Sequence, residues 1–212
     1  MRPEPRELRA LARRDPRLGA ALRRVPPLPD FPREGPGARR SRYEALARAI
    51  VFQQLSGKAA GTIWRRACAL SGRGRFPRPP ELAGLSDGEL RAAGLSANKQ
   101  LALRDLARRV EDGRLRLRAL GQLDDEAVIR ELVAVRGIGR WTAQMFLLFQ
   151  LGRPDVMAPD DLGLQEGLRR LDGLAERPGP RELAARAEVW APLRSVASWT
   201  LWRLVDMEAQ TL

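Results

Sequence analysis

Histidine is absent from the 212 residues of this sequence, and Cys68 is the only cysteine. No disulfide can form within one chain, and four thiolates for an iron-sulfur cluster are not available. A zinc site would have to rely on carboxylates and a single thiol, and no imidazole can serve as a general base. The sequence therefore indicates that any chemistry performed by this chain uses carboxylates.

Long apolar runs are also missing. Residues 1–24 are studded with arginine, and no stretch of 18 residues is apolar throughout. A secretory signal or a transmembrane helix would need such a run. We therefore expect a cytoplasmic protein, located at the nucleoid if the source is bacterial.

Lysine is scarce although the chain is strongly basic. The formal net charge is +12 and the sequence pI is about 11.4, yet only Lys58 and Lys99 are lysines. Such a charge suits a polyanionic partner, because basic side chains contact phosphates and release counterions. An arginine-rich composition can also reflect the nucleotide composition of a genome, so charge alone leaves nucleic-acid binding open.

Apolar residues recur at helical spacing along most of the chain, and no run shows the alternation of a β strand. The pattern predicts helices at 4–24, interrupted near Asp15–Pro16, and at 43–70, kinked or divided near Ser56–Gly57. Further helices are expected at about 86–93, 96–112, 124–134, 140–151, 161–171, 180–190 and 192–208. Residues rich in proline and glycine at 25–37 and 71–80 predict loops. The expected fold class is all-α.

A short turn with two glycines lies between the predicted helices at 124–134 and 140–151. Gly137 and Gly139 allow unusual backbone angles and leave no side chain to keep a phosphate away. The free N–H groups at the start of the second helix form an anion site, helped by the helix dipole. Such a turn predicts a clamp for the DNA backbone that does not read the base sequence.

Residues 137–143 read Gly-Ile-Gly-Arg-Trp-Thr-Ala, and Pro-Asp-Asp follows at 159–161. This combination resembles the helix-hairpin-helix (HhH-GPD) DNA glycosylases, in particular the 3-methyladenine DNA glycosylase II branch. Further similar segments at 43–63, 94–99 and 190–203 extend the resemblance over roughly residues 42–206. It implies a two-lobed helical fold with the DNA- and base-binding cleft between the lobes. Residues 41–212 would form the glycosylase domain, with the hairpin at 126–150. Residues 1–40 would be a helical extension and Pro-rich loop in place of a full β domain.

The resemblance implies that Asp161 is the catalytic residue. Cleavage of an N-glycosidic bond passes through an oxocarbenium-like sugar, so the site needs an anion near C1′. A carboxylate at a helix N-terminus is favoured in its charged form. The alternative is that Asp160 and Asp161 only cap a helix, and we expect Asp160 to do so.

Trp141 stands where the resembling enzymes with lyase activity carry a lysine. Because tryptophan cannot form a Schiff base, a monofunctional enzyme that uses water is expected. Trp141 and Trp202 match tryptophans of the base pocket, and Met145 stands where the branch often has a tyrosine. Aromatic faces would attract a flipped, cationic alkylated base. Other aromatic residues are expected in the core, namely Trp64, Phe146, Phe149, Trp190 and Trp199.

The resemblance also implies a DNA-binding surface. Gln54 aligns with the residue that fills the gap left by a flipped base; Leu55 could serve instead, or both could be helix residues with no role in DNA binding. Phosphates would be contacted at the hairpin and by basic residues, namely Gly137, Ile138, Gly139, Arg140 and Lys58. A structural K⁺ or Na⁺ could bind the backbone carbonyls of Val133, Val135 and Ile138. No cofactor would be required, and the iron-sulfur cluster of the endonuclease III branch is excluded.

The sequence therefore predicts a monofunctional enzyme of base excision repair, similar to 3-methyladenine DNA glycosylase II. It would flip alkylated bases out of double-stranded DNA and hydrolyse the N-glycosidic bond, acting as a monomer. Two alternatives stay open. The substrate could be another lesion, such as hypoxanthine, uracil, 1-methyladenine or 3-methylcytosine, or the chain could be a noncatalytic DNA-binding module of the same fold.

Overall fold

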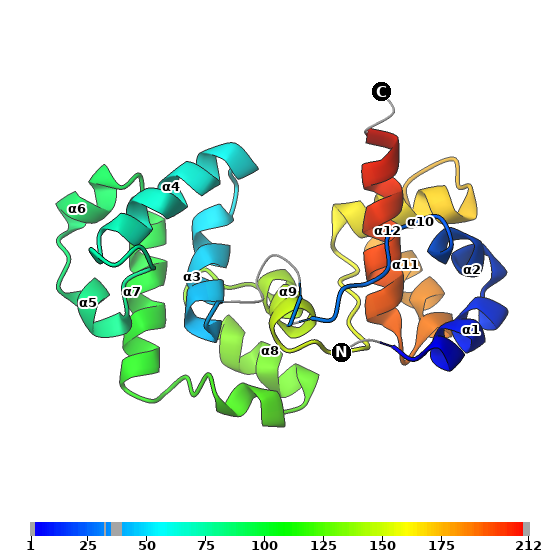
Figure 1. Cartoon of the computed structure of the whole chain (residues 1–212), viewed down its shortest axis with the longest axis horizontal. Coiled ribbons are helices and arrows are strands. Elements are labelled where there is room, and N and C mark those ends of the chain that lie inside the picture. Colours follow the sequence, from blue (N-terminus) through cyan, green and yellow to red (C-terminus); the bar gives the residue numbers. More distant parts are fainter. Residues whose placement is uncertain (1–2, 32, 35–39, 210–212) are drawn as a thin grey trace. The chain divides into compact units, whose positions relative to one another are not determined.

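A computed structural model describes residues 3–31, 33–34 and 40–209 (Figure 1). Within these ranges the regular elements are all helices, and no β strand is present. The predicted all-α fold is therefore confirmed. No helix in this part of the chain is both long enough and apolar enough to cross a membrane. Part of the predicted loop at 25–37 lies outside the described residues.

The chain divides into two compact units, Met1–Ala38 with Leu147–Leu212, and Arg39–Phe146. The first unit contains α1 (Pro5–Arg14), α2 (Pro16–Leu22), α10 (Leu162–Asp172), α11 (Pro180–Ala187), η2 (Glu188–Trp190) and α12 (Arg194–Ala209). The second contains α3 (Arg42–Phe52), α4 (Gly57–Ala69), α5 (Pro79–Ala83), α6 (Asp87–Ala92), α7 (Ala97–Glu111), η1 (Ala119–Gln122) and α8 (Asp125–Val133). The boundary falls within α9 (Arg140–Gln150).

Helix starts follow from local capping chemistry. In six helices a short polar side chain accepts a hydrogen bond from the backbone N–H three residues later: Asp15, Ser41, Ser56, Ser86, Asp124 and Asp161. Four helices, α1, α2, α5 and α11, carry proline in their first turn. The backbone N–H groups of the first turn have no partner inside a helix. A capping side chain accepts a hydrogen bond from one of them, and proline has no N–H that would need a partner. The predicted break at Asp15–Pro16 is confirmed.

The predicted division of the 43–70 stretch near Ser56–Gly57 is confirmed, since α3 ends at Phe52 and α4 starts at Gly57 after the cap Ser56. Another stretch differs in detail from the sequence expectation. The predicted loop at 71–80 ends at Pro79, where the five-residue helix α5 begins. A helix of that length is too short to show apolar periodicity, so it was not expected.

In the first unit, α10 packs closely against α12 (Figure 1). Gly167 of α10 makes this possible. A Cβ atom at that position would lie 2.6 Å from the carbonyl oxygen of Leu201 and 2.7 Å from its Cβ. Because Leu201 is fully buried in α12, neither helix could move to make room for such a Cβ atom without loss of packing.

The N-terminal helices are joined to the same unit by a buried carboxylate. Asp15 Oδ2 accepts hydrogen bonds from the indole of Trp190 (2.7 Å) and the guanidinium of Arg186 (2.6 Å), which also pairs with Asp172. Burial alone would raise the pKa of Asp15. Its hydrogen bonds from the Leu18 N–H, Trp190 and Arg186 outweigh burial, so its pKa is lowered below 3.8.

Replacing Gly167 with alanine should destabilise the first unit, because the added methyl group has no space. We expect a loss of about 1–3 kcal/mol in the free energy of unfolding, measured by urea denaturation. Gly61→Ala in α4 is the matched control, since a Cβ there would have no neighbour within 4 Å. That variant should gain about 0.5–1 kcal/mol. Equal effects of the two substitutions would contradict the close helix contact.

Replacing Asp15 with asparagine should cost about 1.5–3 kcal/mol of stability at pH 7, because hydrogen bonds to a charged group are lost. A depressed folded-state pKa gives stability that is present above the unfolded pKa and is lost as the pH falls through the folded pKa. The difference between wild type and Asp15→Asn should therefore stay constant above about pH 5 and shrink below 3.8. Urea denaturation at several pH values measures it; a difference that is independent of pH would refute the assignment.

Candidate active site and DNA-binding surface

Asp161 lies at the N-terminus of α10, in a turn where its N–H donates to the carbonyl oxygen of Ala158 (3.0 Å). Its side-chain Oδ1 accepts hydrogen bonds from the backbone N–H of Leu164 (2.8 Å) and from the indole Nε1 of Trp202 (3.1 Å). The structure thus brings two of the predicted site residues together. The expectation that Asp160 caps the helix is wrong: Asp160 is exposed in the preceding turn, and Asp161 is the cap.

Gly163 allows the indole of Trp202 to reach the carboxylate. A Cβ atom at Gly163 would lie 3.0 Å from Asp161 Oδ1 and 3.1 Å from Trp202 Cδ1. Such distances are tighter than ordinary contacts, so with any larger residue the carboxylate or the indole would have to shift by a few tenths of an ångström. Gly163 is one helical turn before Gly167. Because neither glycine has a side chain, α12 can pack closely against the first turns of α10.

Trp202 belongs to a cluster of aromatic rings in the first unit. Its ring stacks on Phe149 with centroids 6.0 Å apart, and Phe31 meets Phe149 edge-on at 5.0 Å. Phe31 also contacts the ring of Trp199 at 5.9 Å, whose indole donates to the carbonyl oxygen of Pro26 (2.8 Å). The orientation of Trp202 therefore depends on packing as well as on its hydrogen bond.

Sequence reasoning identified only part of this cluster. Trp190 and Phe146 are buried, as expected, whereas Trp199, Phe149 and Trp64 keep part of their surface exposed. Phe31 was missed. It is buried but follows a Pro-rich stretch outside any helix, so no periodicity marked it as a packing residue.

The backbone that leads to Asp161 is attached to α12 by two buried serines. Ser195 Oγ donates to the carbonyl oxygen of Arg153 (2.6 Å) and accepts from the N–H of Val156 (3.0 Å). Ser198 Oγ donates to the carbonyl oxygen of Val156 (2.9 Å). Because buried polar groups are costly without partners, these bonds fix the path of the chain just before the carboxylate.

In the second unit, the predicted hairpin joins α8 to α9. Gly137 has a φ of +77°, which favours glycine, and the N–H of Ile138 donates to the carbonyl oxygen of Val135 (3.1 Å). The side chain of Ile138 is buried, so this residue can offer a ligand only its backbone. Gly139 directly precedes α9, and the start of a helix is a place where backbone N–H groups can bind an anion.

The basic residues predicted to contact phosphates differ in their surroundings. Arg140 forms an ion pair with Glu126, which lowers the pKa of that carboxyl group. A phosphate would have to compete with this carboxylate for the guanidinium. Lys58 is exposed in the first turn of α4.

Gln54 and Leu55 lie in the connection between α3 and α4, not in a helix. Gln54 has a φ of +57° and is the only residue other than glycine with a positive φ in the described part of the chain. This conformation costs an L-residue about 1–2 kcal/mol. Both side chains are exposed, Leu55 to 38%. Strained backbone of this kind is found most often at functional sites.

Trp141 and Met145 lie one turn apart on α9, in the second unit. Trp141 is 47% exposed, unusually open for tryptophan, and Met145 is half-buried. Residues four apart share one face of a helix. Their pairing on α9 and the pairing of Asp161 with Trp202 are separate features, one in each unit.

Val133, Val135 and Ile138, whose carbonyl oxygens are the predicted ligands of a monovalent cation, lie at the end of α8 and in the hairpin turn. The carbonyl oxygen of Val135 already accepts the N–H of Ile138 (3.1 Å). No group of three or more acidic or cysteine side chains that could hold a metal occurs in the described ranges.

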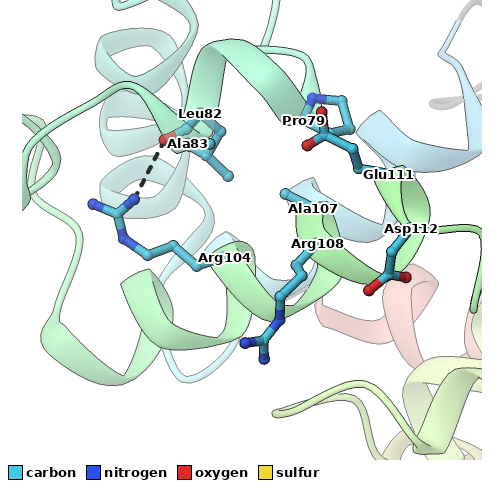
Figure 2. A pocket seen from close by; sticks show the side chains of 8 residues that line it. All are labelled: Pro79, Leu82, Ala83, Arg104, Ala107, Arg108, Glu111 and Asp112. Carbon is cyan, nitrogen blue, oxygen red and sulfur yellow. Dashed lines mark hydrogen bonds between the residues drawn. The ribbon is translucent and has the colours of Figure 1, made fainter.

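A cavity of about 370 Å³ lies elsewhere in the second unit, between α5 and α7 (Figure 2). Its walls include Leu82 and Ala107, with Arg104 bonded to the carbonyl oxygen of Leu82 at the rim. None of the predicted site residues lines it. It is therefore separate from the hairpin and from Asp161.

Comparison with known proteins gives a consistent result. Residues 47–192 match the HhH-GPD superfamily of base excision DNA repair proteins. DNA-3-methyladenine glycosylase 1 of Schizosaccharomyces pombe is 38% identical over 162 residues, covering 76% of this chain and 71% of the relative.

Two solved structures are also similar. A 3-methyladenine DNA glycosylase of S. pombe in complex with abasic DNA has a TM-score of 0.83 at 32% identity, over 95% of this chain and 97% of the other. A DNA-3-methyladenine glycosidase of Bacillus halodurans has a TM-score of 0.82 at 35% identity, over 98% and 92%.

Proposed function

The chain belongs to the HhH-GPD superfamily of base excision DNA repair proteins, and we propose that it is a monofunctional DNA glycosylase of the 3-methyladenine DNA glycosylase II type. It removes alkylated bases from double-stranded DNA by hydrolysis of the N-glycosidic bond. The single observation that carries the proposal is Asp161, a carboxylate placed at a helix N-terminus and hydrogen-bonded by the Trp202 indole.

Asp161 supplies the anion that the reaction needs. As the glycosidic bond breaks, positive charge develops on the sugar, and a fixed carboxylate near C1′ stabilises that charge or orients the attacking water. Leu164 N–H and Trp202 hold Oδ1 in place. A preorganised carboxylate of this kind does not have to reorient during the reaction, which is why it lowers the barrier.

For an alkylated base, the enzyme has to bind the leaving base selectively but does not have to protonate it. Methylation at N3 of adenine or N7 of guanine makes the base cationic and a good leaving group. Trp141, Met145 and Trp202 are proposed to contact the flipped base, each aromatic face contributing about 0.5–2 kcal/mol by cation-π attraction. Because Trp141 replaces a lysine, no Schiff base forms and the strand is not nicked.

DNA binding is assigned to the second unit. The hairpin residues Gly137, Ile138 and Gly139 bring the backbone up to a phosphate without a side chain in the way, assisted by Lys58 and Arg140. Gln54, with Leu55 beside it, enters the duplex where the base has left. A K⁺ or Na⁺ bound by the hairpin carbonyls would bring positive charge close to the same phosphate. The protein acts in the cytoplasm as a monomer on one duplex and requires no other cofactor.

Asp161→Asn should abolish most of the activity without unfolding the protein. Asparagine is also a good N-cap, so the free energy of unfolding should change by less than about 0.5 kcal/mol. Loss of the charge should reduce base release by about 100- to 1000-fold. The measurement is release of methylated bases from alkylated duplex DNA under single-turnover conditions, with strand nicks scored before and after alkali.

The matched control is Asp160→Asn, at the exposed neighbouring position, which should keep near wild-type base release. Nicks should appear only after alkali. Unchanged base release by Asp161→Asn would exclude the proposed chemistry. Tight DNA binding with no base release from the wild type would favour another lesion or a noncatalytic module.

Trp202→Phe should separate the hydrogen bond from the stacking. Phenylalanine keeps a ring against Phe149 but has no N–H for Asp161, and a hydrogen bond to a charged group contributes about 1.5–3 kcal/mol. We expect single-turnover base release to fall by about 10- to 100-fold, with a smaller change in the Kd for DNA. Trp199→Phe loses an indole donor to a backbone carbonyl instead, and should have a much smaller effect. Similar losses in both variants would show that ring packing alone matters.

A further inference from the structure

In the second unit, two exposed loops are fastened to one helix, α7. Lys99 Nζ donates to the carbonyl oxygen of Val51 (2.7 Å), in the last turn of α3 before the Gln54 loop. Asp105 Oδ2 accepts from the backbone N–H of Arg136 (2.9 Å), at the start of the hairpin turn. Both hydrogen bonds are made to backbone atoms of the loops, so they fix the position of the loop backbone and not only that of a side chain.

The hairpin also rests directly on α7. A Cβ atom at Gly137 would lie 3.2 Å from the Cβ of Ala102, which is buried. Burial alone would raise the pKa of Asp105, but the Arg136 N–H and the side chains of Arg109 and Arg108 lower it to about 2. The acceptor is therefore charged at neutral pH, and its bond to the hairpin is a strong one.

Gln53 joins the two loops to each other. Its Nε2 donates to the carbonyl oxygen of Gly137 (2.8 Å). The next residue is Gln54, with its left-handed backbone and exposed side chain. The side-chain amide of Gln53 thus links the peptide group of Gly137 in the hairpin to the backbone next to Gln54.

Each loop also has an attachment of its own to α7. Lys99 already holds the end of α3, and Asp105 with Ala102 holds the hairpin. The separate contribution of Gln53 is the spacing between the hairpin and Gln54.

We infer that Gln53 is a positioning residue that couples contact of the hairpin with a DNA phosphate to insertion of Gln54 into the duplex. The inference rests on the proposed function, in which these two loops bind DNA. When the hairpin binds a DNA phosphate, the position of Gln54 relative to the DNA backbone is fixed as well. Nonspecific binding therefore places Gln54 where base flipping needs it. Loss of the Gln53 hydrogen bond leaves the hairpin able to bind but makes insertion less accurate.

The test uses Gln53→Met, which keeps the length of the side chain but has no N–H donor. Gln122→Met, at an exposed position of η1 in the same unit, is the matched control. All variants are made in an Asp161→Asn background, so that the readout does not depend on catalysis. Unstacking is followed by 2-aminopurine fluorescence beside an abasic-site analogue in a duplex, and affinity is measured on the same duplex without the lesion.

Gln53→Met should reduce the unstacking signal or its rate by about 5- to 10-fold, the effect of one hydrogen bond. The Kd for undamaged DNA should change less than about threefold, and the urea midpoint should stay close to that of Gln122→Met. Gln54→Ala should weaken unstacking in the parent but add little on top of Gln53→Met, because coupled residues are not additive.

Three outcomes would overturn the inference: equal losses in unstacking and in affinity for undamaged DNA, effects of Gln53→Met and Gln54→Ala that multiply, or no unstacking by the parent protein. The last would also remove the role of Gln54. Normal unstacking without release of methylated bases by the protein with Asp161 intact would instead contradict only the proposed chemistry.

Discussion

The position of the carboxylate at Asp161 depends on the close approach of α10 and α12. Gly167 lets the backbone of Leu201 lie where a side chain would otherwise be, and Gly163 leaves room for the indole of Trp202. The hydrogen bond between Trp202 and Asp161 follows from that approach, since both partners are carried to the contact by their helices. A larger residue at Gly167 would disturb the helix contact through Leu201, whereas one at Gly163 would meet the Asp161 carboxylate directly.

The second unit uses a different means to hold its functional surface. Its loops are fixed through backbone carbonyl and N–H groups, which Lys99 and Asp105 reach from α7 and Gln53 reaches from one loop to the other. Contacts of this kind leave the loop side chains available for a partner. They also explain how Gln54 can keep a left-handed backbone, because strain at one residue persists only where its neighbours are held firmly.

Much of the fold and part of the candidate site could be predicted from the sequence. Apolar periodicity and caps such as Asp15 located most helices, and the hairpin glycines with Asp161 were recognisable as a motif. The contacts of Phe31, Gly163 and Gln53 could not be predicted. Each depends on residues far apart in the chain, and nothing in local spacing indicates which backbone carbonyl a glutamine will reach.

The composition also limits the chemistry in a way that favours one class of lesion. A neutral base leaves slowly unless a group donates a proton to it, and histidine, the commonest donor, is absent. Asp161 accepts hydrogen bonds from Leu164 and Trp202, which suits a carboxylate that stabilises positive charge on the sugar. A site with such a stabiliser and exposed aromatic faces works best when the base is already cationic. Alkylated purines meet that requirement, because methylation gives the base its positive charge before the glycosidic bond breaks.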